Sequence, residues 1–237
     1  MSSPGATVDS ATRRLAIVMP VLNEAAGIEQ ALAALQPLRA RGARVIVVDG
    51  GSSDDTVARA GGADLVLVAE RGRARQMNVG AQRADADVLL FLHADTRLPA
   101  DADRHIDAAL AGGACWGRFD VSIDGHSRWL GVVAAMMNWR SHLTGICTGD
   151  QALFVTRDFF EALNGFPDQP LMEDIEWSRR ARSLSRPAIV GARATTSGRR
   201  WEQRGLWRTI ALMWSLRWRY FLGADPAALA QRYREVR

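Results

Sequence analysis

The sequence contains no lysine. All 30 basic residues of the 237-residue chain are arginines, and 26 acidic residues leave a formal net charge of +4. The absence of lysine excludes a Schiff-base lysine, a P-loop lysine and lysine-assisted nucleotidyl transfer. Phosphate groups must therefore be bound by arginine, a metal ion or backbone N–H groups.

Cysteines and long apolar runs are also scarce. Cys115 and Cys147 lie far apart and form no CxxC motif, which argues against a disulfide framework or a structural zinc site. No run of about 18 apolar residues predicts a transmembrane helix. Residues 1–12 lack the apolar segment of a signal peptide and are expected to form a disordered tail. We expect a cytoplasmic protein, with peripheral contact at the inner membrane face as the alternative.

Short apolar runs alternate with helical patterns in the first half of the chain. Strands alternating with helices favour an α/β fold with a mainly parallel central sheet flanked by helices. The expected strands are 15–19, 45–48, 65–68 and 88–92, and the expected helices are 24–38, 55–60 and 73–83.

The second half is less regular and ends in two expected helices. Residues 116–123 alternate apolar and polar side chains, which predicts a strand exposed on one face. We divide the chain into a tail (1–12), a domain (13–200, with halves 13–98 and 99–200) and C-terminal helices (201–237). Those helices are rich in Arg and Trp, which favours packing either on the domain or on an anionic membrane surface. The other expected helices are 101–110, 127–140, 157–163, 174–184, 206–221 and 226–234, and the other strands are 152–155 and 188–190.

Polar residues follow three of the predicted strands at the point where each strand ends. Pro20 and Glu24 follow the first strand, Asp49 ends the second, and His93 and Asp95 follow the fourth. The carboxyl ends of parallel strands meet at one edge of a sheet, where open α/β sheets bind ligands. Each position taken alone is also compatible with an ordinary turn, but their convergence indicates a binding site.

The chemistry of these residues suits a phosphorylated ligand. Asp49 can accept hydrogen bonds from a base or a ribose. Arg71, Arg73 and Arg75 cluster at a predicted helix start, which suits a diphosphate, although a solvated basic turn would look the same. Asp95 is a hard oxygen ligand of the kind that Mg²⁺ and Mn²⁺ prefer.

Two polar clusters in the second half are further candidates. Residues 149–151 (Gly149, Asp150, Gln151) could line an acceptor pocket or form a plain turn. Glu173 and Asp174 begin a predicted helix, where acids are favoured by the helix dipole alone, but one of them could also act as a general base. A loop carrying Arg200 could close over a diphosphate.

The order of these motifs resembles the family 2 glycosyltransferases with a GT-A fold. The similarity rests on IVMPVLNE, VVDGGSSDDT, RARQMNVG, FLHADT, GDQALFV and MEDIEWSRR, which span most of residues 15–182. Within the family, GRARQMN, FLHADT, GDQ, MEDIEW and the RRWE…RG tail are most similar to the radical-SAM/selenodomain-associated bacterial transferases.

The resemblance implies a nucleotide-diphospho-sugar donor, a divalent metal (Mn²⁺ or Mg²⁺) and transfer to an acceptor hydroxyl, usually with inversion. By position, Asp95 would bind the metal and Asp174, or else Glu173, would be the base. The sequence departs from the family at His93, which replaces the first acid of an Asp-x-Asp motif and could instead hydrogen-bond the donor sugar. The remaining donor residues implied by position are Pro20, Glu24, Asp49, Arg73, Asn78 and Arg200.

Two other functions stay open at this point. A sugar-nucleotide nucleotidyltransferase could share the sheet, but the missing lysines and the lack of an N-terminal glycine-rich phosphate loop weigh against it. A non-enzymatic module that binds a membrane surface would explain the C-terminal third. No nucleic-acid motif accompanies the basic charge, so a nucleic-acid partner is not expected.

Overall fold

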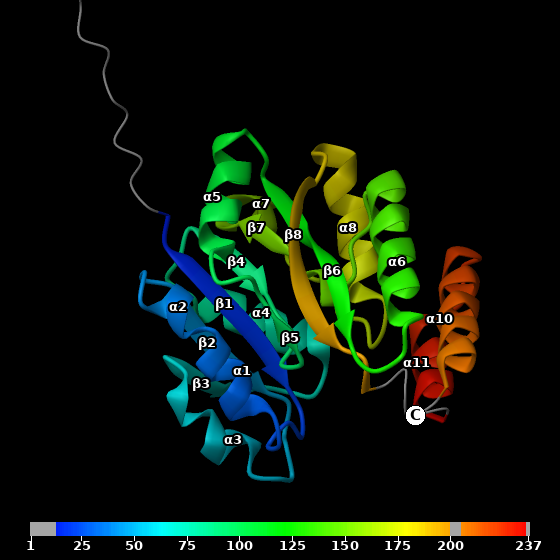
Figure 1. The fold of residues 1–237 in the computed structure, drawn as a ribbon, viewed down its shortest axis with the longest axis horizontal. Helices are drawn as coiled ribbons and strands as arrows, with labels where there is room; N and C mark the ends of the chain where they lie inside the picture. Colours follow the sequence, from blue (N-terminus) through cyan, green and yellow to red (C-terminus); the bar gives the residue numbers. More distant parts are fainter. Residues whose placement is uncertain (1–12, 200–204, 236–237) are drawn as a thin grey trace, which may run out of the picture.

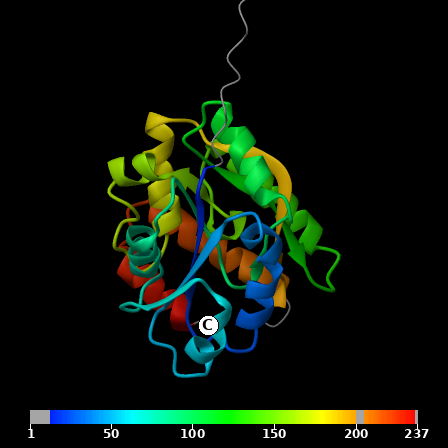
Figure 2. The same ribbon diagram turned by 90° about the vertical axis from the view of Figure 1, so that its left-hand side faces the viewer.

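The computed structural model describes residues 13–199 and 205–235, so the predicted tail at 1–12 and Arg200 lie outside the described residues. One eight-stranded sheet forms the centre, in the order β3-β2-β1-β4-β7-β6-β8-β5, with helices on both faces (Figures 1 and 2). The strands are β1 (Leu15–Val21), β2 (Arg44–Asp49), β3 (Leu65–Val68), β4 (Val88–Phe91), β5 (Thr96–Arg97), β6 (Trp116–Asp124), β7 (Phe154–Thr156) and β8 (Ala188–Ser197).

The helices surround this sheet and continue beyond it at the C-terminal end. They are α1 (Ile28–Ala34), α2 (Gln36–Arg39), α3 (Thr56–Arg59), α4 (Arg73–Arg83), α5 (Ala102–Ala111), α6 (Leu130–Thr144), α7 (Arg157–Ala162), α8 (Glu173–Leu184), α10 (Leu206–Phe221) and α11 (Pro226–Glu235), with short 3-10 turns η1 (Ala60–Gly62) and η2 (Gly149–Gln151).

The sheet is parallel in its first half and mixed in its second. β1 pairs in parallel with β2 and β4, β2 with β3, and β6 with β8, whereas β7 and β5 run antiparallel to their neighbours. The predicted α/β fold with a mainly parallel sheet is therefore confirmed, with antiparallel insertions in the second half. Because β1, β2 and β4 are parallel neighbours, their carboxyl ends lie along one edge.

Alternation along the central strands divides the core into two layers. On β1, Ile17 and Met19 pack toward α1, α2 and α5, while Ala16 and Val18 pack toward α4, α7 and α8. Residues of both kinds are buried because helices cover both faces, which explains why these strands are continuous apolar runs. Both cysteines are free, as expected: Cys147 is buried and Cys115 is partly buried.

The single helix predicted over 24–38 is wrong. Residues 24–27 form a turn, and the helix is interrupted at Leu35, where α1 ends and α2 begins. Pro37 sits in the first turn of α2, where its missing N–H is tolerated, but it cannot continue a helix that runs through it. The apolar residues of α1 and α2 still follow one helical spacing because both helices bury their apolar side chains in the same layer of the core.

The predictions for β6 and β8 also need correction. The expected exposed face of β6 is largely covered, because α6 packs on it and Arg118 is buried. β8 runs to Ser197, well past the predicted end at residue 190. Its register against β6 shifts between Phe119 and Asp120, where β8 carries the extra residues Gly191 and Ala192. This irregularity and the weakly apolar segment that follows it concealed the strand.

The two C-terminal helices pack on the domain. Leu216 of α10 and Leu229 of α11 form a small apolar cluster with Ile146, Met172 and Ile175 at the start of α8. This packing agrees with one of the two placements expected for these helices. Among the residues that the structure describes, no helix combines the length and apolar character needed to cross a bilayer.

Candidate active site

The loops after β1 and β2 are joined into one unit by their own polar groups. The Asp49 carboxylate accepts hydrogen bonds from the backbone N–H groups of Gly51 and Ser52 at 2.9 Å each, and from the Ser52 hydroxyl. The Ser53 N–H donates to the Asn23 side chain at 2.9 Å, and the Glu24 N–H donates to the Thr56 hydroxyl at 2.8 Å. Asp49 is therefore buried and shapes the loop that would face a ligand.

Gln76 was not among the predicted site residues, although it lies in the RARQMNVG motif. Its amide group donates hydrogen bonds to the carbonyl oxygens of Val21 and Val48, both at 2.8 Å, and so ties α4 to the ends of β1 and β2. A Cβ on Gly50 would lie 2.9 Å from the Gln76 side chain. The pair explains the glycine at the start of this loop: the buried amide needs the space.

Residues far apart in the sequence meet beyond the end of β4. Arg73, the first residue of α4, makes an ion pair with Glu173, whose side chain is only 1% exposed. The Nδ1 atom of His93 lies 3.3 Å from the Asp150 carboxylate, and its Nε2 atom lies 3.5 Å from the Arg73 guanidinium. Because a guanidinium can only donate, these contacts fit the His93 tautomer that has its proton on Nδ1, facing Asp150.

The charge of Arg73 is fixed by its surroundings. Burial lowers the pKa of the Arg73 guanidinium, but the negative charges of Glu173, Asp174 and Asp150 outweigh this, and the pKa is raised overall. The Arg73 side chain remains 38% exposed, so it combines an internal partner with access to the surface. Such a cation can meet a diphosphate without losing its place in the fold.

Asp174 is held at the start of α8 by two backbone groups. One carboxylate oxygen accepts the N–H of Gly149 at 2.8 Å, and the other accepts the N–H of Ile175 at 2.8 Å. Each oxygen keeps a further lone pair, so the carboxylate is oriented but can still accept a proton. The contact with Gly149 joins the predicted acceptor segment 149–151 directly to the predicted base.

Three of the segments around this site have unusual backbone conformations. Asn23, Ala152 and Met172 have positive φ angles of 55°, 47° and 66°. A positive φ is costly for a side chain as large as methionine. Met172 immediately precedes Glu173 and Asp174, and Ala152 immediately follows Gln151. This strain therefore lies beside the segments that supply the charged groups, which is where a functional requirement would place it.

Asp95 lies two residues beyond His93, at the same edge of the sheet. Its carboxylate accepts one long hydrogen bond, from the Thr96 hydroxyl at 3.4 Å. Within residues 13–199 and 205–235, no group of three His, Cys, Asp or Glu side chains could hold a metal ion on its own. Mg²⁺ is commonly bound through one or two carboxylates, substrate phosphates and water. Asp95 fits an ion shared with a substrate rather than an ion held by protein groups alone.

The remaining predicted site residues are placed as follows. Pro20 lies opposite Val48 near the end of β1. The Asn78 side chain is bonded in both directions to the backbone of Phe166, at 2.9 Å each, so it holds a loop against α4. Gln151, the last residue of η2, is fully buried. Arg200 lies outside the described residues. The side-chain hydrogen bonds of Asp49 and Asp95 stay within their own loops and do not reach the Arg73–Glu173 cluster.

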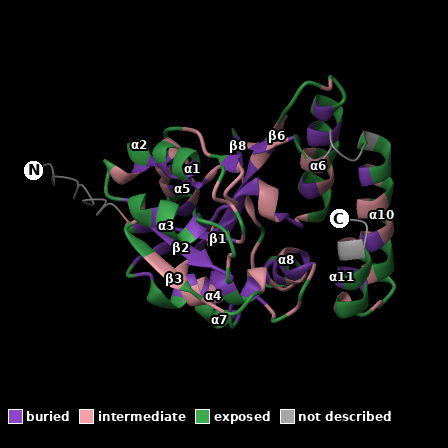
Figure 3. Ribbon diagram, turned by 90° about the horizontal axis from the view of Figure 1, so that it is seen from below, coloured by how far each residue is buried: buried purple, intermediate pink, exposed green. Residues whose placement is uncertain are grey.

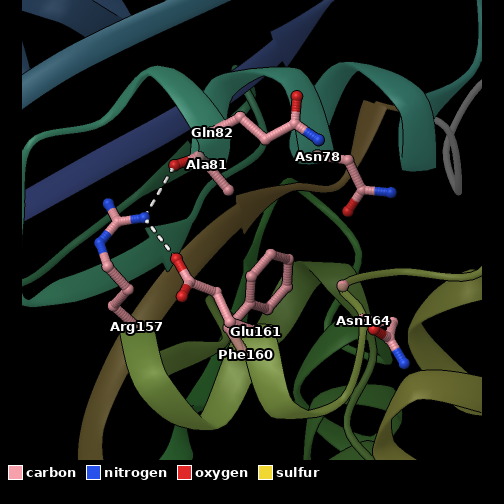
Figure 4. Close-up of a pocket in the computed structure, with 8 residues that line it drawn as sticks. Asn78, Ala81, Gln82, Arg157, Phe160, Glu161 and Asn164 are labelled. Atoms are coloured by element: carbon pink, nitrogen blue, oxygen red, sulfur yellow. Dashed lines mark hydrogen bonds and ion pairs between the residues drawn. The ribbon is translucent and has the colours of Figure 1, made fainter.

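Two hollows differ in their relation to these residues. A small one, with a cavity volume of about 10 Å³, is lined by residues that include Arg73, His93, Gly149, Glu173 and Asp174. A more open one lies between α4 and α7, and of the predicted site residues only Asn78 lines it (Figure 4). There Arg157 bonds to the Ala81 carbonyl and to Glu161, which secures the end of α4. We assign no chemistry to the second hollow.

Comparison with known proteins follows the same lines. A sequence profile described as Glycosyl transferase family 2 matches residues 16–159. A search of curated proteins finds no match to the chain.

Solved structures with a similar fold include three glycosyltransferases. The mannosyltransferase PcManGT from Pyrobaculum calidifontis, in complex with GDP-Man and Mn²⁺, superimposes with a TM-score of 0.61 at 19% identity, covering 78% of this chain and 57% of that one. TarS 1-349 from S. aureus, in complex with UDP-GlcNAc, superimposes with a TM-score of 0.64 at 16% identity, covering 78% of this chain and 58% of that one. Glucosyl-3-phosphoglycerate synthase from Mycobacterium tuberculosis, in complex with Mn²⁺, UDP-Glc and phosphoglyceric acid, superimposes with a TM-score of 0.59 at 19% identity, covering 82% of this chain and 77% of that one. The chain thus spans less than two thirds of the first two proteins.

Proposed function

The chain belongs to glycosyl transferase family 2, and we propose that it moves a sugar from a nucleotide-diphospho-sugar to an acceptor hydroxyl with inversion. One observation carries the mechanistic part of this proposal. Asp174 is oriented by Gly149 of the predicted acceptor segment, near the Arg73 guanidinium beyond the end of β4. A base and a diphosphate-binding cation at one sheet edge are the two groups that direct glycosyl transfer requires.

The groups at this edge divide the work between donor and acceptor. The loops of Glu24 and Asp49 lie where the nucleoside would bind. Arg73 would bind the diphosphate and offset the charge that grows on it as the sugar–phosphate bond breaks. Asp174 would accept the proton of the acceptor hydroxyl. The oxygen of that hydroxyl would bond to the anomeric carbon, and the diphosphate would leave with the electron pair of the broken sugar–phosphate bond.

Asp174 is a better candidate for the base than Glu173. Glu173 is 1% exposed and paired with Arg73, so its carboxylate is committed to that ion pair. Asp174 is only partly buried and keeps lone pairs on both oxygens. His93 would position Asp150 and Arg73 rather than contact the substrate, because its two ring nitrogens face these two protein groups.

We further propose that a divalent ion accompanies the donor. Asp95 would hold it, and the ion would supply positive charge beside the diphosphate. Mn²⁺ is present in the structures of PcManGT and of the M. tuberculosis synthase, which supports this view by analogy.

Membership of the radical-SAM-associated subgroup also stays a prediction, based on the motifs GRARQMN, FLHADT and MEDIEW.

A ligand screen tests the donor and the metal together. We expect the melting temperature to rise with sugar nucleotides of one base, and to rise further with Mn²⁺, because a ligand that binds only the folded state stabilises it. Asp95→Ala should abolish the Mn²⁺-dependent part, whereas Asp158→Ala, at an exposed position on α7, should retain it. No stabilisation by any sugar nucleotide would contradict the proposed donor class, and an unchanged Mn²⁺ effect in Asp95→Ala would remove Asp95 from the metal site.

We also propose that the protein works at a membrane surface. Exposed large apolar side chains form one stripe on α6, at residues 129, 132, 136, 139 and 143, and another on α10, at 207, 214, 218, 221 and 222. Trp129 and Trp207 join the stripes, with ring centroids 5.8 Å apart. Trp139 and Trp218 are 66% and 67% exposed. The burial view places exposed residues along these outer helices (Figure 3).

The chemistry of the stripes favours a bilayer over a second copy of the chain. Tryptophan is enriched where one end of a side chain is apolar and the other is wet, as at membrane interfaces. Residues 176–237 contain fourteen arginines and four acidic residues, which suits anionic headgroups. We infer that α6 and α10 lie on the cytoplasmic face of an anionic membrane.

Vesicle sedimentation tests this surface. The protein should sediment with vesicles containing phosphatidylglycerol and much less with pure phosphatidylcholine. The double substitution Trp139→Ser, Trp218→Ser should lose this binding, while Val68→Ser, at an exposed apolar position on β3, should keep it. Equal binding by the double variant, or a concentration-dependent dimer that the double variant abolishes, would contradict membrane binding by these stripes.

A further inference from the structure

Two partly buried arginines in the second half have no side-chain partner among the described residues. Arg140 of α6 and Arg217 of α10 form no hydrogen bond or ion pair through their guanidinium groups with any residue that the structure describes. The Nε and Nη2 atoms of Arg140 and the Nε atom of Arg217 are buried and unbonded. Buried polar atoms are almost always paired, and an unpaired buried cation is especially costly.

The two guanidinium groups are close enough to repel each other. Burial lowers the pKa of Arg140 to about 10, and the positive charge of Arg217 contributes to the decrease. Burial lowers the pKa of Arg217 as well. The carboxylates of Asp174 and Asp150 act on Arg217 in the opposite direction, and Asp174 does so on Arg140, but neither forms an ion pair with them. Nothing in the described residues therefore satisfies this pair of cations.

Two other arginines of this region, Arg118 and Arg180, also have buried guanidinium atoms without a partner, but each is held by at least one protein group. Arg118 forms an ion pair with Asp120 and donates to the carbonyl oxygen of Phe119 at 3.2 Å. Arg180 lies 3.7 Å from the Glu176 carboxylate and donates to the Leu163 carbonyl. Arg140 and Arg217 differ because they lack such acceptors and because they come together from two helices.

The position of the pair separates it from the donor side. Asp174 and Asp150 act electrostatically on both Arg73 and Arg217. Arg73 begins α4, and α8, which carries Asp174, lies between α4 and α10 in two views (Figures 1 and 3). The acids thus stand between one cationic group at the nucleotide edge and another beneath α6 and α10. If the nucleotide occupies the Arg73 side, the second group is on the side left for the acceptor.

We propose that Arg140 and Arg217 bind an oxyanion, a phosphate ester or a carboxylate, carried by the acceptor. An oxyanion between two guanidinium groups would accept hydrogen bonds from the unbonded atoms and neutralise the repulsion between the two cations. It would also hold the acceptor hydroxyl at a fixed distance from Asp174. The assignment to the acceptor rests on the proposed glycosyl transfer, whereas the anion site itself does not.

Calorimetric titration with inorganic phosphate, at ionic strength matched with chloride, tests the site. Wild-type protein should bind phosphate, and Arg140→Leu and Arg217→Met should each weaken binding by about tenfold or more, as expected for one lost charge-assisted hydrogen bond. Arg208→Gln, at an exposed position on α10, should bind like wild type. Unchanged phosphate binding in both interior variants, or no binding by the wild type, would overturn the proposal.

A second arm separates the two possible sources of the oxyanion. Phosphate should bind equally well when the protein is saturated with the nucleoside diphosphate that it prefers. Competition between them would assign the arginines to the donor and overturn the acceptor site. If no nucleoside diphosphate binds at all, the proposed transferase function fails, while the phosphate titration still decides the anion site.

Thermal denaturation without phosphate guards against misfolded variants. Replacing an unpaired buried cation with an apolar side chain is expected to leave the melting temperature unchanged or higher. A lower melting temperature for Arg140→Leu would mean that the guanidinium has a structural partner, which contradicts its role as a vacant anion ligand.

Discussion

The two halves of the molecule differ in how completely their buried polar groups are hydrogen-bonded. In the half that contains β1 to β4, Asp49, Gln76 and Asn78 are all bonded within the chain. In the half that contains α6, α8 and α10, buried donors are left unbonded. Among the described residues, every buried side-chain nitrogen or oxygen atom that lacks a hydrogen-bond partner belongs to a residue between positions 118 and 217. The second half also carries the two exposed apolar stripes.

The difference indicates which half is complete on its own. A site whose groups are already bonded is preorganised and can bind a ligand without paying to rearrange. A region with unpaired cations and exposed tryptophans is satisfied only when something outside the chain is present. Under the proposed function, the first half would be preformed for the nucleotide, while the second half would be completed by the acceptor and the membrane surface.

The sharpest test of this division is Asp174→Asn, at the boundary between the halves. The amide cannot accept the acceptor proton, so turnover should fall by about 10²–10⁴-fold, the usual contribution of a general base. Donor binding, which depends on the other half, should be retained. Steady-state kinetics and calorimetry with the donor measure the two quantities, with Asp158→Asn as the exposed control. Normal turnover in Asp174→Asn would remove this residue from the mechanism.

Much of the first half could be predicted from the sequence. Apolar runs identified β1 to β4, and helix spacing placed α4 at its observed limits, Arg73–Arg83. The acids that follow the strands could be located because parallel topology alone brings strand ends together. Local patterns were sufficient for the strands, for α4 and for the Asp49–Ser52 turn, whereas the longer contacts of Gln76 with Val21 and Val48 were not predicted.

The second half was less accessible because its contacts are long-range. The Arg73–Glu173 pair spans 100 positions, and no local pattern announces it. Arg140 and Arg217 were missed because only the packing of α6 and α10 shows that their side chains are partly buried. An arginine that follows the apolar stretch WLGVVAAMMNW was the one available signal, but it is also compatible with a solvated helix end.

A second test compares two arginines on the same helix. Arg73→Met removes the partner of a buried carboxylate. Breaking a buried pair costs about 3–5 kcal/mol, and the 38% exposure of Arg73 reduces our expectation to about 1–3 kcal/mol. Arg75→Met removes only exposed pairs with Glu70 and Asp168 and should lower the free energy of unfolding much less than Arg73→Met. Chemical denaturation measures both, and equal losses would show that the Arg73–Glu173 pair is not special.

The smallest expected effect is at the junction of the halves, where Gly149 touches the His93 ring. A Cβ at position 149 would lie 2.3 Å from Cε1 and 2.4 Å from Nε2 of His93, so Gly149→Ala must displace the ring and loosen its bond to Asp150. Overpacking of this kind costs about 1 kcal/mol or more. Because the N–H of Gly149 also orients Asp174, turnover should fall severalfold while donor affinity stays constant. Gly131→Ala on α6 faces open space and should be neutral or slightly stabilising. If Gly149→Ala matched Gly131→Ala in both denaturation and kinetics, the two halves would not be coupled through this contact, and the orientation of Asp174 would have to come from α8 alone.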